Sequence, residues 1–258
     1  MNIPFYKYNG TGNDFIMIDN RDQIFDPSKT ELIKQLCTRH FGIGADGLIL
    51  LENEAGYDFK MVYFNSDGNE STMCGNGGRC IIRFAHDLKI IGEECKFIAI
   101  DGSHLGKVSD AVVSIQMQDV HHIDVNKTRS ELDTGSPHYV AFVDELPGKE
   151  FVQVAGDIRR NAPYTKRGIN VNFATVKNNA IKMRTFERGV EDETLACGTG
   201  ATAVAIAAFH TEKVNKTSIP VQVMGGDLNI SFDTSNGTYS NIWLTGPAEF
   251  VFEGKIKA

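Results

Sequence analysis

The sequence has no long apolar run and no excess of positive charge. No stretch reaches the roughly 20 apolar residues that a membrane-spanning helix requires, so no association with a membrane is expected. Acidic residues outnumber basic ones by 33 to 26, and the net charge is −7, so nucleic acid is not an expected partner either. The first residues lack a basic segment followed by an apolar one, and we therefore expect no secretion signal.

Cysteine is scarce, and its spacing fits neither a disulfide scaffold nor a zinc site. The chain has five cysteines, an odd number, at positions 37, 74, 80, 95 and 197. Cys74 and Cys80 are too far apart for the usual metal-binding knuckle, and no second ligand pair follows, so no metal is expected. A reducing cytoplasm is the simplest location for such a chain.

The rest of the composition is that of an ordinary globular protein. The 258 residues are 41% hydrophobic and 23% charged, and nothing in them indicates disorder. This length suits one large domain or two domains of about 120 residues each.

One short motif occurs twice in the chain. Residues 70–77 read Glu-Ser-Thr-Met-Cys-Gly-Asn-Gly, and residues 193–200 read Glu-Thr-Leu-Ala-Cys-Gly-Thr-Gly. A helical pattern follows each copy, so the motif predicts Cys74 and Cys197 at helix N-termini. Unpaired backbone N–H groups and the positive end of the helix dipole stabilise anions there. A thiol pKa of about 8.5 can fall to roughly 3.5–7.5 in such a place.

The duplication suggests that the two sites face each other. A substrate carboxylate held between two helix N-termini would expose its α-carbon to one sulfur on each side. That arrangement removes a proton from one face of the carbon and returns one to the other. The glycines after each Cys leave room for a carboxylate to approach the backbone.

Strands are expected to outnumber helices throughout the chain. The helix after the first motif has an apolar face within residues 81–91 and is predicted to end near Gly92, whereas residues 201–209 are apolar almost all round, which indicates a buried helix. Two further helices are predicted at residues 29–40 and 151–158. The predicted strands are two within residues 5–19 around a glycine loop, then 48–51, 57–64, 96–100, 107–117, 138–144, 168–176, 181–186, 219–224, 228–232, 241–245 and 249–252.

The polar segment 119–134 is the expected boundary between two halves, 1–118 and 119–248, because it offers little to pack. The repeat extends beyond the Cys motifs: Asp19 closes a strand 55 residues before Cys74, and Asp144 closes a similar strand 53 residues before Cys197. We therefore predict two similar halves with a cleft between them, which is a usual place for a small-molecule site.

These features together resemble the diaminopimelate epimerase family, and the resemblance covers nearly the whole chain. It implies an α+β fold of two pseudo-symmetric halves, each a rolled, mostly antiparallel sheet around a central helix, with the active site in the cleft. It also implies that the C-terminal strand, 249–258, returns to the N-terminal half. The segments that carry the resemblance are 12–15, 39–46, 65–68, 74–79, 137–138, Asn170, 187–189, 194–200, 225–227 and 244–248.

The resemblance implies an isomerase that needs no cofactor, pyridoxal phosphate included. Such an enzyme interconverts LL- and meso-2,6-diaminopimelate in the synthesis of lysine and peptidoglycan precursors. Cys74 and Cys197 would be the base and the acid, exchanging roles with the direction of the reaction. The expected partner is thus a small amino acid. A homodimer is a further expectation, with Phe252 at a position where some relatives place a Tyr in a dimer contact.

The same resemblance assigns roles to the other site residues. Backbone N–H groups would hold the reacting carboxylate, and Asn13 would serve the amino group at the reacting centre. Arg188 would bind the distal carboxylate as a fork, helped by Asn65, Asn170 and Glu187. His138 and Glu187 would adjust the protonation of the thiol pair, and a proton on His138 would stabilise a thiolate. The backbone N–H groups are those of Gly75, Asn76, Gly198 and Thr199.

The sequence departs from the family pattern at three places. Ser136 stands where many relatives have an Asn, Gly47 stands where some have a Gln, and the segment before Glu193 is one residue longer than usual.

Two other functions stay open. One alternative is a proline-racemase-like enzyme, although the motifs of that group differ from those here. The other is a binding or redox-sensing protein without catalysis, in which Cys74 and Cys197 form a disulfide.

Overall fold

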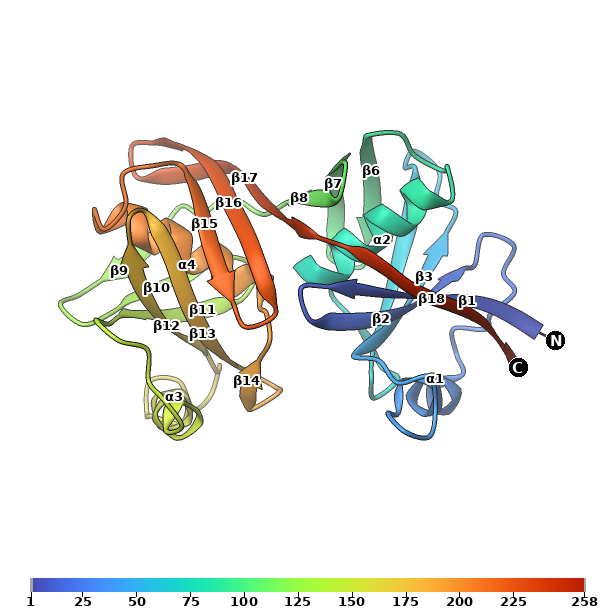
Figure 1. Ribbon diagram of the computed structural model, residues 1–258, viewed down its shortest axis with the longest axis horizontal. Helices are drawn as coiled ribbons and strands as arrows, with labels where there is room; N and C mark the ends of the chain where they lie inside the picture. The colour runs from blue at the N-terminus through green and yellow to red at the C-terminus, as the bar shows by residue number, and fades with distance from the viewer. Residues whose placement is uncertain (1, 258) are drawn as a thin grey trace. The chain divides into compact units, whose positions relative to one another are not determined.

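The computed structural model describes residues 2–257, so Met1 and Ala258, the outermost residues of the expected N-terminal half, lie outside it. Within the described residues the chain forms four α-helices and 18 β-strands, and the predicted α+β class is confirmed. The chain separates into two compact units (Figure 1). Unit 1 runs from the N-terminus to Ile115 and resumes at Gly246, and unit 2 runs from Gln116 to Thr245.

Unit 1 is a mostly antiparallel sheet wrapped around one helix. Strand β2 pairs in parallel with β3, and β4 pairs in parallel with β6, while the other pairs in this unit are antiparallel. Helix α2 packs against β1, β2, β3 and β7, so it lies inside the sheet, and α1 packs against β3. The elements are β1 (Asn2–Gly10), β2 (Asn13–Asp19), α1 (Thr30–Cys37), β3 (Gly47–Glu52), β4 (Phe59–Asn65), β5 (Glu70–Ser71), α2 (Gly75–Asp87), β6 (Glu94–Ala99), β7 (Gly102–Ser109), β8 (Val112–Gln116) and β18 (Glu249–Lys257).

Unit 2 repeats this plan. Helix α4 packs against β10, β11, β12, β13, β15 and β16, and α3 packs against β12, β13 and β14. The parallel pairs are β11 with β12 and β13 with β15. The elements are β9 (Ile123–Val125), β10 (Ser130–Asp133), β11 (Pro137–Phe142), α3 (Phe151–Arg159), β12 (Asn170–Lys177), β13 (Ala180–Glu187), β14 (Asp192–Thr194), α4 (Gly198–His210), β15 (Ser218–Val223), β16 (Gly226–Ser235) and β17 (Thr238–Pro247).

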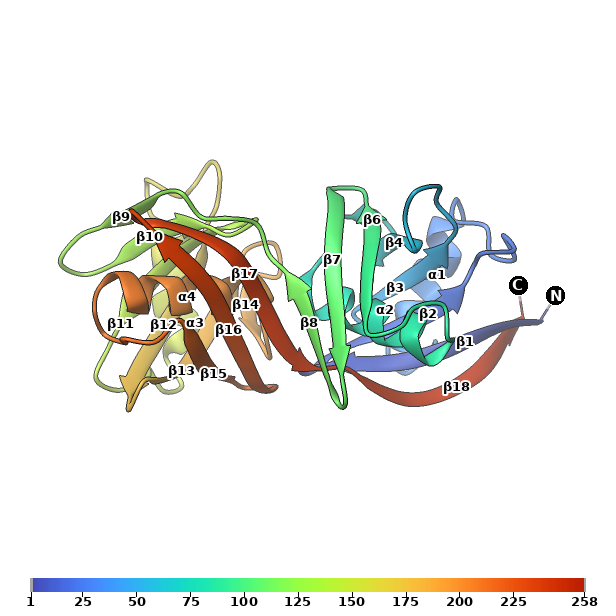
Figure 2. The same ribbon diagram turned by 90° about the horizontal axis from the view of Figure 1, so that it is seen from above.

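The two units match element by element, as expected for pseudo-symmetric halves. The series β1, β2, α1, β3, β4, β5, α2, β6 and β7 in unit 1 corresponds to β10, β11, α3, β12, β13, β14, α4, β15 and β16 in unit 2, with the same parallel and antiparallel pairings. Strand β18 pairs with β1 as β9 pairs with β10, so the last strand of the chain takes in unit 1 the place that β9 has in unit 2. Figure 2 shows β18 alongside β1.

Apolar burial positions the two motif helices. The side chains of α4 are small, and residues 201–208 are all fully buried, as predicted from the apolar pattern. Such a helix allows strands to close around it on every side. A second layer of core lies outside each sheet, one cluster against α1 around Phe25 and Ile33 and the other against α3 around Phe151 and Phe173.

Some predicted elements differ from those observed. The single strand expected at residues 107–117 is two strands, β7 and β8, joined by a tight turn in which Asp110 has a φ of +50°. Helix α2 ends at Asp87, short of the predicted limit, and Lys89 follows with a φ of +59°. The segment 119–134, expected to pack little, contains β9 and β10 and buries Val120 and Leu132.

Candidate active site

Cys74 caps helix α2 in unit 1, as its motif predicts. Its backbone is extended, with φ −106° and ψ 144°, and its Sγ accepts a hydrogen bond of 3.2 Å from the backbone N–H of Gly77. The sulfur therefore lies beside the backbone N–H groups of the first helical turn, where a thiolate is stabilised. A Cβ at Gly77 would lie 3.3 Å from that sulfur and 3.1 Å from Ile49 Cδ1, so a side chain there would crowd the thiol.

A line of hydrogen bonds runs from α2 to the start of β2. Arg79 donates to Asn76 Oδ1 at 3.0 Å, and Asn76 Nδ2 donates to Asn13 Oδ1 at 2.5 Å. Asn13 Nδ2 then donates to Asp46 Oδ2 at 2.8 Å. A guanidinium only donates and a carboxylate only accepts, so the two ends determine which way both amides face. Asn13 consequently presents its oxygen to the first turn of α2, beside the Cys74 motif.

Arg79 is a fully buried cation whose hydrogen-bond partners are neutral. Besides Asn76 it donates to Gly75 O at 3.2 Å and to Thr11 Oγ1 at 2.8 Å. Burial lowers the pKa of Arg79 to about 10, which leaves it charged at neutral pH, and negative charge on Cys74 acts in the opposite direction. By the same interaction, the buried guanidinium stabilises a thiolate on Cys74.

Asp46 is held in place by a cluster of charges behind Asn13. Arg39 Nη2 lies 2.9 Å from Asp46 Oδ1 and 2.6 Å from Asp14 Oδ1, and Lys7 Nζ lies 2.8 Å from Asp14 Oδ2. Burial alone would raise the pKa of Asp14, but Arg39 and Lys7 hold it below its usual range. Asp14 therefore stays ionised at neutral pH, and its ion pair with Arg39 holds that guanidinium beside Asp46.

Asn65 and Gly47 face each other at the ends of neighbouring strands. Asn65 is the exposed last residue of β4 and is paired in register with Gly47 on β3. A Cβ at Gly47 would lie 2.5 Å from both Phe64 O and the Tyr63 ring. A side chain at position 47 would therefore force its neighbours to move.

Cys197 caps helix α4 in unit 2, again as predicted. Its backbone is extended, with φ −127° and ψ 109°, and its side chain is buried. Its Sγ lies 3.4 Å from Thr199 Oγ1. A Cβ at Gly200 would lie 2.8 Å from Asn172 Oδ1 and 3.3 Å from Cys197 Cβ, so glycine is required for this approach of helix and strand.

His138 lies on β11, next to the Cys197 motif, and is fully buried. Its Nε2 lies 3.0 Å from Thr199 Oγ1, and its Nδ1 lies 3.1 Å from Asn172 Nδ2. Burial, and to a lesser degree the Arg188 guanidinium, lower the pKa of His138 to about 3. The ring is therefore neutral at neutral pH, so any proton by which His138 stabilises a thiolate is the one that a neutral imidazole carries.

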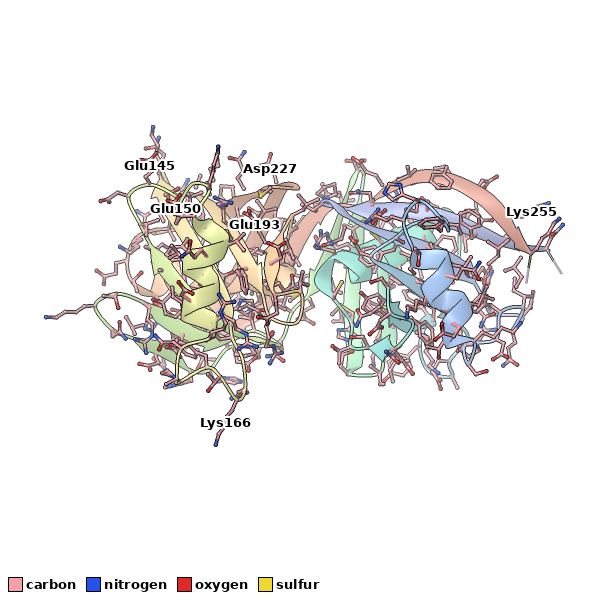
Figure 3. The ribbon with its side chains drawn as sticks, turned by 90° about the horizontal axis from the view of Figure 1, so that it is seen from below. Glu145, Glu150, Lys166, Glu193, Asp227 and Lys255 are labelled. Carbon is pink, nitrogen blue, oxygen red and sulfur yellow. The ribbon has the colours of Figure 1, made fainter. Side chains whose placement is uncertain are left out.

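Arg188 follows the end of β13 and is exposed, and its guanidinium is held by contacts with Arg167 and Ser136. Its Nη1 donates to Arg167 O at 3.0 Å and its Nη2 lies 3.4 Å from Ser136 Oγ. Asn170 connects to both sides, because its Oδ1 accepts from the Arg188 backbone N–H at 2.8 Å and its Nδ2 donates to Ser136 at 2.9 Å. Ser136 thus joins the network. Lys166, in the loop that supplies the Arg167 carbonyl, points away from the unit (Figure 3).

The two glutamates near the second motif, Glu187 and Glu193, lie on different strands and have different surroundings. Glu187 is the half-buried last residue of β13, directly before Arg188. Glu193 makes a two-bond ion pair with Arg184, at 2.6 and 2.5 Å, and Arg184 lies over the Phe151 ring. Glu193 therefore ties β14 to β13. Its counterpart Glu70 is exposed on β5.

The other three cysteines are buried away from the helix N-termini. Burial raises the pKa of Cys37 and of Cys95 to about 12, and raises the pKa of Cys80 as well. These thiols are consequently protonated and unreactive at neutral pH. Cys37, Cys80 and Cys95 form no disulfide.

Sequence reasoning assigned no role to Arg79, Asp46, Asn172 or Thr185. Arg79 and Asp46 lie inside segments that matched the family, so their charge beside glycine-rich turns was an available signal. Asn172 follows Asn170 by two residues on one strand, and residues so spaced share a face of the sheet. Thr185 lies opposite Asn172 in register, which becomes visible only once the strands are paired.

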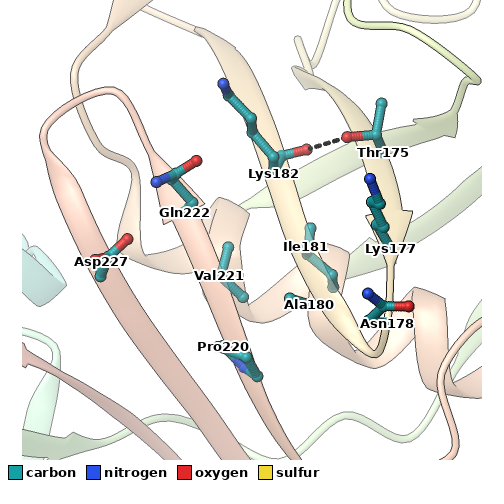
Figure 4. A pocket seen from close by; sticks show the side chains of 10 residues that line it. All are labelled: Thr175, Lys177, Asn178, Ala180, Ile181, Lys182, Pro220, Val221, Gln222 and Asp227. Atoms are coloured by element: carbon teal, nitrogen blue, oxygen red, sulfur yellow. Dashed lines mark hydrogen bonds between the residues drawn. The ribbon is translucent and has the colours of Figure 1, made fainter.

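A separate cavity of about 580 Å³ lies in unit 2 at the β12–β13 hairpin (Figure 4). Its lining includes Lys177, Lys182 and Asp227 and contains none of the predicted site residues. Among residues 2–257, no helix is long and apolar enough to cross a membrane.

Comparison with known proteins agrees with the sequence motifs. The family model described as diaminopimelate epimerase matches residues 5–123 and 131–251. A diaminopimelate epimerase from Flavobacterium psychrophilum is 53% identical over 256 residues, covering 98% of this chain and 100% of that protein. Among solved structures, a PhzF-family phenazine biosynthesis protein from Bacillus anthracis has a TM-score of 0.75 at 13% identity, covering all of both chains. A probable proline racemase from Agrobacterium radiobacter K84 has a TM-score of 0.68 at 15% identity, covering 99% of this chain and 93% of that one. At these identities the two structures show a shared fold only.

Proposed function

The chain belongs to the diaminopimelate epimerase family, and from this premise we propose that it interconverts LL- and meso-2,6-diaminopimelate without a cofactor. The observation that carries the mechanism is the pair of cysteines, Cys74 and Cys197, each of which caps the helix of its own unit at equivalent positions of a duplicated fold. Two equivalent thiols suit a reaction that is chemically the same in both directions.

The proposed chemistry moves one proton onto the substrate and one off it. A thiolate takes the proton from the α-carbon, so an S–H bond forms as the C–H bond breaks, and the electron pair stays on the carbon. The thiol of the other cysteine then donates its proton to the opposite face and becomes the thiolate. Cys74 and Cys197 exchange these roles when the direction reverses. The pair carries one proton in total, so its titration belongs to both sulfurs together.

We assign the reacting carboxylate to the backbone N–H groups that follow each cysteine. Gly75 and Asn76 begin α2, and Gly198 and Thr199 begin α4, so their N–H groups lie at the positive end of a helix dipole, where anions bind. Donors fixed at the site of developing negative charge stabilise the carbanion without reorganising, which is commonly the largest contribution to catalysis. Asn13 would accept from the substrate's amino group, and the orientation of its Oδ1 supports this role.

We assign the distal end of the substrate to Arg188 with Asn65, Asn170 and Glu187. The exposed guanidinium has five N–H donors, and its contacts with Arg167 and Ser136 use only two of them, so it can still bind a carboxylate. Asn170 holds the backbone at Arg188 and so sets the position of that group. Because an amino acid without a distal carboxylate would forgo the charged contact with Arg188, such a substrate should bind more weakly.

His138 and Glu187 complete the proposal as residues that adjust the thiol pair. His138 would act on Cys197 as a neutral hydrogen-bond donor, since its ring is uncharged near neutral pH. The resemblance to the family supports the same kind of role for Glu187. A cytoplasmic location is part of the proposal.

The test is solvent exchange with LL-diaminopimelate in deuterated water. The wild-type protein should form the meso isomer and incorporate deuterium at the α-carbon. Cys74→Ser and Cys197→Ser should each reduce inversion by orders of magnitude, because a hydroxyl is a far weaker acid and base at neutral pH than a thiol. Cys95→Ala is the matched control, since this buried cysteine has no role in the proposal, and it should retain inversion.

Two outcomes would contradict the proposal. Inversion that persists in either serine variant would show that the cysteine is not an acid–base group. Racemisation of free proline, without any action on diaminopimelate, would move the chain to another substrate.

We further propose that the protein forms a homodimer through β18. Three successive large apolar residues of this strand, Phe250, Val251 and Phe252, are 50%, 53% and 43% exposed. A hollow of about 300 Å³ adjoins Phe250, lined by Tyr6, Tyr8, Phe84, Asp87, Leu88 and Phe250 itself. Large apolar side chains exposed in this number on one strand are typical of a protein interface.

A further inference from the structure

The imidazole of His138 is surrounded by hydrogen-bond donors. Asn172 Nδ2 lies 3.1 Å from its Nδ1, and on the other side Asn170 Nδ2 lies 3.5 Å from its Nε2, where Thr199 Oγ1 is closer at 3.0 Å. A neutral imidazole accepts at one nitrogen and donates at the other, and an imidazolium only donates. The identity of the accepting nitrogen therefore depends on which way the amides face.

The amide of Asn172 can face only one way. Its Nδ2 donates to the backbone carbonyl of Tyr139 at 2.9 Å, and because a carbonyl only accepts, the atom beside it must be the nitrogen. Its Oδ1 accepts from Thr185 Oγ1 at 2.9 Å. The second proton on the Asn172 nitrogen then points at His138 Nδ1, which must be the accepting atom.

The proton of the neutral ring consequently lies on Nε2. This nitrogen donates to Thr199 Oγ1, and the Asn170 amide competes poorly for it, because its contact of 3.5 Å is long and its nitrogen also donates to Ser136 at 2.9 Å. With its oxygen accepting from His138, the Thr199 hydroxyl is left to donate to Cys197 Sγ at 3.4 Å.

The charged groups around the ring favour the same neutral form. Arg188 is the charged group that acts on it, and this guanidinium, after burial, lowers the pKa of His138. The carboxylate of Asp133, on the adjacent strand β10, pairs with Arg167 instead. From α4 the titratable group is Cys197, which reaches the ring through Thr199.

We propose that Asn172 is a positioning residue that holds His138 as the tautomer with its proton on Nε2, so that a line of donors from His138 through Thr199 stabilises Cys197 as a thiolate. The inference rests on the proposed function in taking Cys197 as one of the two acid–base groups. No proton moves along this line. His138 and Thr199 keep their protons, and Cys197 exchanges its proton with the substrate carbon alone.

The tautomer can be read directly by NMR on protein labelled with ¹⁵N-histidine, without substrate. Comparison with His138→Gln identifies the His138 signals among the seven histidines. We expect an unprotonated Nδ1 and a protonated Nε2 that do not titrate around neutral pH. In Asn172→Asp, a carboxylate should accept from Nδ1–H, and the ring should carry protons on both nitrogens. A proton on Nδ1 in the wild-type protein, or an ordinary histidine titration, would overturn the proposal.

The reactivity of Cys197 gives a second test of the donor line. This test does not require that an Asn172 variant folds. The rate of alkylation of Cys197 by iodoacetamide is followed against pH by mass spectrometry. Thr199→Val keeps the shape of the side chain and removes the donor, so the apparent pKa of Cys197 should rise by about one unit. Thr199→Ser should restore the wild-type profile.

Thr202→Val is the matched control. Thr202 is a buried residue of the same helix, and its hydroxyl donates to Gly198 O at 3.0 Å, outside the line to Cys197. Its loss should leave the alkylation profile of Cys197 unchanged. An unchanged profile in Thr199→Val, or an equal shift in Thr202→Val, would refute the donor line.

These readings are independent of the epimerase assay. If the NMR and alkylation results are as expected and diaminopimelate is not inverted, the proposed function fails while the hydrogen-bond line stands. If inversion occurs and the profiles of Cys197 do not respond, the reverse holds.

Discussion

At the scale of single residues, burial of His138 makes stability depend on pH. Its pKa in the folded protein is about 3, against 6.5 for an unperturbed histidine. Between these values the unfolded chain binds a proton that the folded chain does not, so the free energy of unfolding should decrease as the pH falls. One proton gives a slope of up to about 1.4 kcal/mol per pH unit. Above pH 6.5 this residue is neutral in both states and adds no pH dependence.

Urea unfolding of the wild-type protein and of His138→Gln, at several pH values between about 7 and about 5, measures this slope. Glutamine does not titrate, so the variant should lose less stability over this interval than the wild type. Equal losses in the two proteins would mean that His138 has an ordinary pKa in the folded state.

The sequence locates the two cysteines but not the side chains that hold their surroundings. Cys74 and Cys197 were placed at helix N-termini from a local pattern, and the structure confirms that placement. The contacts of Asn172 depend on the register between strands far apart in the chain, which local patterns do not contain. The tautomer of His138 likewise depends on the backbone carbonyl of Tyr139. Because every residue has such a carbonyl, no sequence pattern marks this one.

At the scale of elements, the position of α2 depends on a close approach to β1. A Cβ at Gly10 would lie 2.8 Å from Asn76 O and 2.9 Å from Cys80 Sγ, so the first turn of the helix would have to move. Gly10→Ala should therefore lower the free energy of unfolding by about 1–3 kcal/mol, as is typical of overpacking. Because Cys74 caps the same turn, kcat should fall as well.

Gly92→Ala is the control for this prediction. A Cβ at Gly92 would meet nothing within 4 Å, and this residue lies in the loop after α2. Chemical denaturation and the epimerase assay should show little change in this variant. If Gly10→Ala behaves like Gly92→Ala, the contact between β1 and α2 does not position the motif.

Regular elements were largely predictable, whereas their breaks were not. Alternating or helical apolar patterns identified most strands and all four helices. The turn at Asp110 and the end of α2 near Lys89 use left-handed backbone at residues other than glycine, so they carry no glycine or proline signal. Strands β5 and β14, of two and three residues, are too short to show a period.

At the scale of the whole molecule, the proposed homodimer predicts a dependence on the exposed aromatic side chains of β18. Phe252→Glu would place a carboxylate within an apolar interface. The free energy needed to remove that charge from water would disfavour association. The variant should therefore sediment as a monomer in analytical ultracentrifugation where the wild type sediments as a dimer. Val112→Glu, at an exposed position on β8 in the same unit, is the matched control and should leave the dimer intact.

A monomeric wild-type protein, or dissociation by both variants, would remove β18 as the interface.

The duplication itself was visible in the sequence because each half repeats its Cys motif and its preceding strand. The interruption of unit 1 is encoded only in the pairing of β18 with β1, between segments more than 200 residues apart.

The pairing of Asn2 with Lys257 brings the first and last described residues to the same end of an antiparallel ladder. Force applied to these two points would open the ladder like a zipper, one hydrogen bond after another, instead of shearing all of it at once. Unit 2, inserted between β8 and β18, would bear no load until that zipper had opened. Joining the same two points with a short peptide would instead give a closed ring, and new ends cut in a surface loop of unit 2 would leave both motif helices unbroken.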